Sequence, residues 1–110
     1  MAYDEQLADR IRAALGRRSA TEKKMFGGLA FLIGGNMAVA ASGQGGLLVR
    51  VDPTDTEALL AEPGAEEFDM GGRGPMKGWL RVRPDVLADD ATLKAWVDRG
   101  VAHAASLPPK

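Results

Sequence analysis

Residues 24–51 decide the fold: KMFGGLAFLIGGNMAVAASGQGGLLVRV. Apolar runs over roughly residues 24–33, 37–41 and 47–51 are separated by Gly34-Gly35-Asn36 and by the glycine-rich residues 42–46. Short apolar runs between turns that contain Gly and Asn are typical of strands joined by hairpins. We therefore predict an antiparallel meander of three strands.

The same region raises the question of a membrane helix, because residues 25–49 carry no charged side chain. A transmembrane helix needs about 20 predominantly apolar residues, but the glycines of this run, with Asn36, Ser42 and Gln44, favour turns between strands. The first five residues show neither a basic nor an apolar targeting segment, and the chain has no Cys, which suits a reducing compartment. We expect a cytoplasmic protein that does not enter a membrane.

The alternation of side chains predicts which faces of the strands are buried. In the third run Leu47, Val49 and Val51 share one face, and Leu48 and Arg50 share the other. Residues 24–33 are apolar on both faces, as in a strand that is covered on both sides. We expect a second copy of the chain to cover the second face in a homodimer. The alternative is cover from within, by the first or the last helix.

Helical patterns flank the strands. An amphipathic helix is predicted over about residues 4–18, a short helix begins at Asp52-Pro53, and strands follow over about 66–70 and 78–83. A last helix, capped by Asp89 or Asp90, has an apolar stripe made of Leu93, Trp96, Val97, Gly100 and Ala104. The order α-βββ-α-ββ-α predicts an α+β fold of two layers, an antiparallel sheet with helices mainly on one face. The length of 110 residues suits one domain over residues 1–110.

The residues that could support catalysis are few. His103 is the only histidine and no Cys exists, so no pattern of metal ligands or of an activated nucleophile can be assembled. The adjacent acids Glu66-Glu67 and Asp89-Asp90 are better explained by a strand and a helix cap. The glycine loop 71–74 is followed by Pro75 and a strand, whereas a phosphate loop needs a helix there. We expect no catalytic residue, no metal and no cofactor, and hence a protein that is not an enzyme.

Segregated charge indicates a candidate binding surface. Residues 52–69 carry seven acidic side chains and no basic one, whereas residues 73–83 carry four basic side chains and no acid. If residues 78–83 form a strand, Trp79, Arg81 and Arg83 share a face, and Leu80 and Val82 point to the core. The candidate contacts to an acidic protein partner, or to nucleic acid, are Arg50, Arg73, Lys77, Trp79, Arg81 and Arg83. The alternative is pairing across strands with the acidic segment, or a solvated face.

Two stretches carry a family resemblance: residues 24–31, KMFGGLAF, followed by Gly35-Asn36-Met37, and Gly72-Arg73 with residues 75–79, PMKGW. They resemble the N-terminal domain of the TfoX/Sxy family, and the likeness extends through residues 49–51 and 89–97. The resemblance implies a fold similar to secretion-chaperone-like domains, and a regulatory or protein-binding role linked to transcription or competence. It implies no catalytic residue or cofactor.

The chain departs from the family pattern at two points. Gly74 separates Arg73 from Pro75, where the pattern runs Gly-Arg-Pro-Met, so we expect an altered loop. Family members that regulate competence carry a further C-terminal domain, whereas this sequence ends at Lys110. We therefore expect a stand-alone domain whose partner the sequence does not identify.

Overall fold

The structure is a computed structural model that describes residues 4–18, 20–25, 27–43, 45–69 and 75–109. Within these residues, one antiparallel sheet has the strand order β1-β2-β3-β4-β6-β5. The strands are β1 (Thr21–Met25), β2 (Gly28–Ile33), β3 (Asn36–Ala41), β4 (Leu47–Arg50), β5 (Ala65–Asp69) and β6 (Pro75–Val82). The helices are α1 (Glu5–Leu15), α2 (Thr56–Leu60), α3 (Pro84–Leu87) and α4 (Asp90–Ser106), with a 3-10 turn η1 (Pro53–Asp55) before α2. The α+β class is confirmed.

The meander has one strand more than predicted. The run over residues 24–33 is a hairpin, because Met25 pairs with Gly28 and the chain reverses between them. Gly27 has φ +74, a conformation that a residue without a Cβ adopts readily. Because the chain reverses there, residues 21–24 pair with β2 and form an edge strand, although their composition does not favour a strand. The prediction of a single strand over this run was wrong for that reason.

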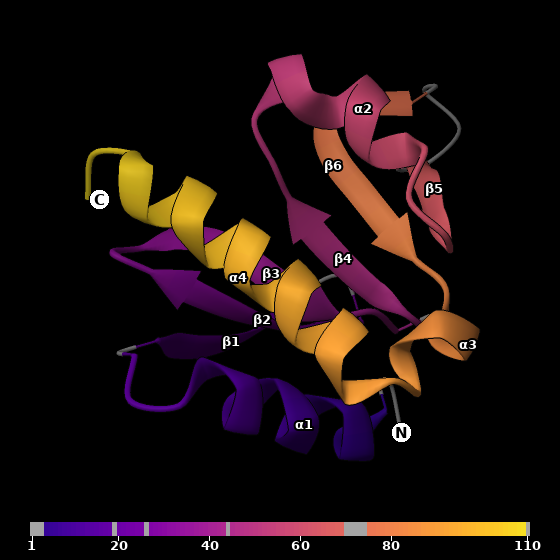
Figure 1. The fold of residues 1–110 in the computed structure, drawn as a ribbon. Helices are drawn as coiled ribbons and strands as arrows, with labels where there is room; N and C mark the ends of the chain where they lie inside the picture. Colours follow the sequence, from indigo (N-terminus) through magenta and orange to yellow (C-terminus); the bar gives the residue numbers. More distant parts are fainter. Residues whose placement is uncertain (1–3, 19, 26, 44, 70–74, 110) are drawn as a thin grey trace.

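Helices α1 and α4 lie on the same side of the sheet, as Figure 1 shows for the indigo and the orange-to-yellow helix. The main core lies between them and the sheet, and Ile11, Phe31, Val49, Leu80 and Val97 are fully buried in it. The predicted stripe of α4 is confirmed, because all of its members are buried. The predicted core side of the last strand, Leu80 and Val82, is confirmed as well.

The connection from β4 to the last two strands runs through η1 and α2, which contact β6, and Leu59 and Leu60 of α2 pack against the main core. Asp52 caps η1 by accepting a hydrogen bond from the backbone N–H of Thr54 at 2.9 Å, and Pro53 follows it, as predicted. The chain then returns so that β6, not β5, lies beside β4. A one-turn helix at Pro84, α3, which the sequence did not indicate, precedes the Asp89 cap of α4.

The opposite face of the sheet carries its own apolar cluster. Ala30, Met37, Ala40 and Leu48 are buried there, and Leu32, Phe68 and Trp79 are partly buried around them. The two-sided apolar character predicted for residues 24–33 is thus confirmed at β2, where Leu29 and Phe31 belong to the main core and Ala30 and Leu32 to this second cluster. In the described part of the chain, no helix is long and apolar enough to cross a membrane.

Candidate functional site

The sheet face opposite α1 and α4, called the open face below, contains the centre of the predicted basic surface. Arg50 of β4 pairs with Trp79 of β6, and the Arg50 Cζ atom lies 5.8 Å from the centroid of the indole. Phe68 of β5 lies on the other side of Trp79, with ring centroids 6.3 Å apart and ring planes at 48°. The guanidinium beside Trp79, and Phe68 beyond that ring, form an amphipathic cluster on three neighbouring strands.

Arg81 has a structural role at this face. Its guanidinium donates to the Glu66 carboxylate on β5 at 3.3 Å and to the carbonyl oxygen of Gly45 in the β3–β4 turn at 2.9 Å. Glu66 is the direct cross-strand neighbour of Arg81. The cross-strand pairing considered from the sequence is therefore present at this position. Arg81 joins β6 to β5 and to a turn 36 residues earlier in the chain.

The remaining predicted contact residues, Arg73, Lys77 and Arg83, do not join this cluster in the described part of the structure. Arg83 follows β6 and pairs with Asp85 at 3.3 Å, with about half of its side chain exposed. Lys77 belongs to β6, but its side chain lies outside what the structure describes, as does the whole of Arg73. The structure therefore brings together Arg50, Trp79 and Arg81, and leaves Arg83 at the end of the strand.

Sequence reasoning missed two residues of the open face. Lys23 pairs with Ala30, whose side chain belongs to the apolar cluster there, so that Lys23 shares the open face. Phe68 was placed in a strand, but nothing in its sequence surroundings indicated contact with Trp79. Recognising a hairpin turn at Gly27 would have predicted the position of Lys23, because that turn makes residues 21–24 a strand of the sheet.

The lowered carboxyl pKa values belong to residues that hold the fold. A hydrogen bond from Arg12 lowers the pKa of Glu22, and one from Arg18 lowers the pKa of Asp98. The N–H and hydroxyl groups of Thr54 and Thr92 lower the pKa values of the two capping residues, Asp52 and Asp89. Among the residues that the structure describes, no three His, Cys, Asp or Glu side chains gather as a metal-binding group.

The geometry defines a class of protein: an α+β domain whose antiparallel sheet packs helices on one face and presents aromatic and cationic side chains on the other. A family model described as the TfoX N-terminal domain matches residues 5–104. The chain belongs to this family. No curated protein and no solved structure matches the chain.

Proposed function

We propose that the protein is a non-enzymatic regulatory module that binds an acidic protein surface through its open face. The observation that supports this proposal best is the cluster of Arg50, Trp79 and Phe68 on three neighbouring strands. Trp, Tyr and Arg are the residues that contribute most energy at protein interfaces, and they do so from well-packed central positions. Membership of the family supports a regulatory role, and we propose transcription or competence regulation as its setting.

The charge of the open face favours an acidic partner. Lys23 and Arg50 lie on it, Arg81 pairs there with Glu66, and Arg83 at the end of β6 pairs with Asp85. The formal net charge of the whole chain is -1. A local cationic face can steer and orient an acidic protein partner even when the molecule as a whole is nearly neutral. Binding of nucleic acid without sequence preference would benefit from a larger positive charge than this molecule carries.

Nucleic acid is a second candidate, because aromatic rings beside arginines also stack on bases. The contact between Arg50 and Trp79 favours it. Binding through so few phosphate contacts would weaken steeply with salt, since each contact releases counterions. We therefore expect any DNA binding to be lost near physiological salt, and a gel-shift titration at low and moderate salt tests this.

A second copy of the chain is another candidate partner, because Ala30, Ala40 and Leu48 form an apolar strip on the open face. We propose that the protein forms a homodimer when no acidic partner is present. Two facing copies would bring cationic side chains together, so the dimer should tighten as salt rises, whereas binding to an acidic partner should weaken. Light scattering at micromolar concentration that shows only the 11.6 kDa species would contradict the dimer.

The binding proposal is tested with charge and size variants of the open face. Arg50→Glu and Trp79→Ala should each abolish capture of a partner protein from cell extract, while both variants remain folded. The matched control is Arg17→Glu, which makes the same charge change at an exposed residue after α1. Equal capture by wild type and both open-face variants would contradict the proposal.

A further inference from the structure

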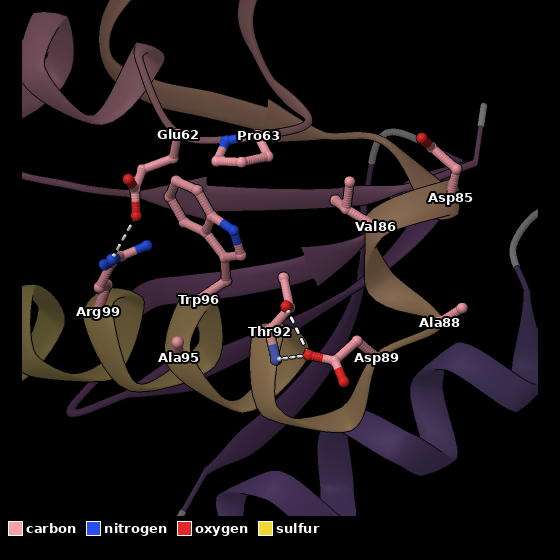
Figure 2. Close-up of a pocket in the computed structure, with 10 residues that line it drawn as sticks. All are labelled: Glu62, Pro63, Asp85, Val86, Ala88, Asp89, Thr92, Ala95, Trp96 and Arg99. Carbon is pink, nitrogen blue, oxygen red and sulfur yellow. Dashed lines mark hydrogen bonds and ion pairs between the residues drawn. The ribbon is translucent and has the colours of Figure 1, made fainter.

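Two neighbouring hollows lie along α4 on the helix side of the protein, away from the open face, and share Arg99 as a wall; together they are called the groove below. Within the described residues, one hollow of about 510 Å³ lies between α3, the turn after α2 and the first half of α4 (Figure 2). A second hollow, of about 490 Å³, lies between η1, α2 and the second half of α4. Arg99 lines both hollows. Each volume falls in the usual range of ligand sites, about 300–1,000 Å³.

Trp96 presents a polar group to the first hollow. The residue is only 2% exposed, and Figure 2 shows its indole nitrogen facing the space toward Val86 and Thr92. No hydrogen bond joins this N–H to any residue that the structure describes, and the nitrogen itself is open to the hollow, because it is not among the buried atoms that lack a partner. A Trp N–H at the end of a buried ring is a donor that a ligand can reach. An acceptor oxygen of a ligand in the hollow would bind it in place of solvent.

Arg99 fixes the position of that indole and leaves the groove acidic. Its guanidinium carbon lies 4.5 Å from the Trp96 ring centroid, and its Nη2 donates to the Glu62 carboxylate at 2.9 Å. This pair is neutral as a unit. Beyond it, the walls carry Asp85 and Asp89 in the first hollow, and Asp52 and Asp55 together with His103 in the second.

The capping acids stay ionised at neutral pH. Asp89 accepts hydrogen bonds from the N–H and hydroxyl of Thr92, at 3.0 and 2.7 Å, and these bonds lower its pKa. Asp52 is held in the same way by Thr54. Their remaining lone pairs can accept charged donors from a ligand. Asp85 pairs with Arg83 at 3.3 Å, an exposed contact that a ligand cation can replace at small cost.

The length of α4 between the two hollows matches a short extended chain. Thr92 and His103, which line the two hollows, are separated by eleven residues of α4, or about 16 Å at 1.5 Å per residue. An extended peptide covers that distance in about five residues, at about 3.3 Å each. Apolar side chains line the groove between the ends, including Pro63, Val86 and Ala95 on one side of Arg99 and Ala58, Leu59 and Ala102 on the other.

We propose that this groove binds an extended peptide segment with two basic side chains four or five residues apart. One basic side chain meets Asp85 and Asp89, the other meets Asp52 and Asp55, and a main-chain carbonyl oxygen between them accepts the hydrogen bond of the Trp96 indole. The proposal does not depend on the open face, because Trp79 and Arg50 contribute nothing to this groove. Failure of either proposal leaves the other standing.

The chain contains two tryptophans, so the variant Trp79→Phe makes Trp96 the only indole and a direct reporter. The probe is the peptide acetyl-Lys-Ala-Leu-Ala-Lys-amide, titrated while Trp96 fluorescence is recorded. We expect a saturable change with half-saturation between about 10 μM and 1 mM. The same peptide with both lysines replaced by glutamate should give none. A free-lysine titration that saturates at the same concentration would show an amino-acid site and contradict the peptide proposal.

Substitutions assign the contacts by calorimetry with the otherwise wild-type protein. The double variant Asp55→Asn/Asp89→Asn removes one charge at each end, and Asn keeps the helix cap at residue 89. Binding should weaken about tenfold. Trp96→Phe keeps a ring but removes the N–H, and should weaken binding about fivefold.

The control is Glu5→Gln, an exposed acid of α1 outside the groove, which should bind as wild type does. Thermal unfolding checks that each variant is folded. Should Trp96→Phe fail to fold, the double variant alone decides. No saturable binding up to about 5 mM peptide, or equal affinity for the double variant and the control, would overturn the proposal.

Discussion

Gly100 of α4 lies against the backbone of Ala38 in β3, so closely that a Cβ atom at residue 100 would stand 2.4 Å from the carbonyl oxygen of Ala38. The same atom would stand 2.7 Å from Cγ1 of Val39. Real Cβ contacts are longer, so the helix can approach the sheet this closely only without a side chain at residue 100. The position of α4 over the centre of the sheet depends on this contact.

Gly100→Ala should therefore destabilise the protein, although alanine favours a helix over glycine by about 1 kcal/mol. Overpacking against backbone costs about 1–3 kcal/mol, and after the helix gain we expect a net loss of up to about 2 kcal/mol of unfolding free energy. Urea unfolding followed by circular dichroism measures it. The comparison is Ala102→Gly, at an exposed position of α4, which should cost about 1 kcal/mol by propensity alone. A stabilised Gly100→Ala would contradict the close packing.

Much of the fold could be predicted from periodicity, because the alternation in β4 and β6 and the stripe of α4 record which side chains are buried. The division of residues 21–33 into two strands could not be predicted in this way. It depends on a turn at Gly27, whose backbone has a positive φ, within an apolar run. The order of β5 and β6 in the sheet could not be predicted either. Either strand could pair with β4 after the η1–α2 connection, and contacts between distant parts of the chain decide that it is β6.

The candidate sites, too, could be predicted from the sequence only in part. The alternation of β4 and β6 predicted that Arg50 and Trp79 leave the core, but their contact required the pairing of those two strands. The bond from Arg81 to Gly45 joins residues far apart in sequence, so no local pattern signals it. Trp96 was predicted as a core residue, which is correct. Its indole nitrogen faces a hollow that α3 helps to line, and the one-turn α3 has too little periodicity to be predicted.

The wall of the groove depends on a second close contact, between Gly64 and Val86 of α3. A Cβ atom at residue 64 would stand 2.4 Å from Cγ2 of Val86, and Gly64 has φ +80. Gly64→Ala should lower the unfolding free energy by about 2 kcal/mol, part steric and part backbone strain. Adding Val86→Ala should recover the steric part, so a double-mutant cycle would give a coupling of about 1 kcal/mol. Purely additive effects would contradict the contact.

Two arginines of the open face should differ in their effect on stability. Arg81→Ala removes bonds to Glu66 and to the Gly45 carbonyl, and should lower the unfolding free energy by about 1 kcal/mol. Arg50→Ala should change it by less than about 0.5 kcal/mol, as expected of a surface substitution. Thermal and urea unfolding of both variants measure the difference. Equal losses would show that Arg50 is as much a part of the fold as Arg81.

Stability should fall in acid. The pKa values of Glu22, Asp52, Asp89 and Asp98 are lower in the folded chain than their usual values near 4. As the pH falls, the unfolded chain therefore takes up protons first. The stabilisation is complete above about pH 5 and is lost as the pH falls through about 4 and below. Urea midpoints at pH 7, 5, 4 and 3 test this, and a midpoint that rises below pH 5 would contradict it.

The central claim, that the open face binds a partner protein, is tested most directly by photocrosslinking in cells. A benzophenone amino acid replaces Leu32, which lies partly exposed on the open face, or Asp9 of α1 as the control. We predict a protein adduct from position 32 that resists nuclease, differs in mass from a pair of 11.6 kDa chains, and disappears with Arg50→Glu. An adduct of equal yield from position 9, or none from position 32, would contradict the claim.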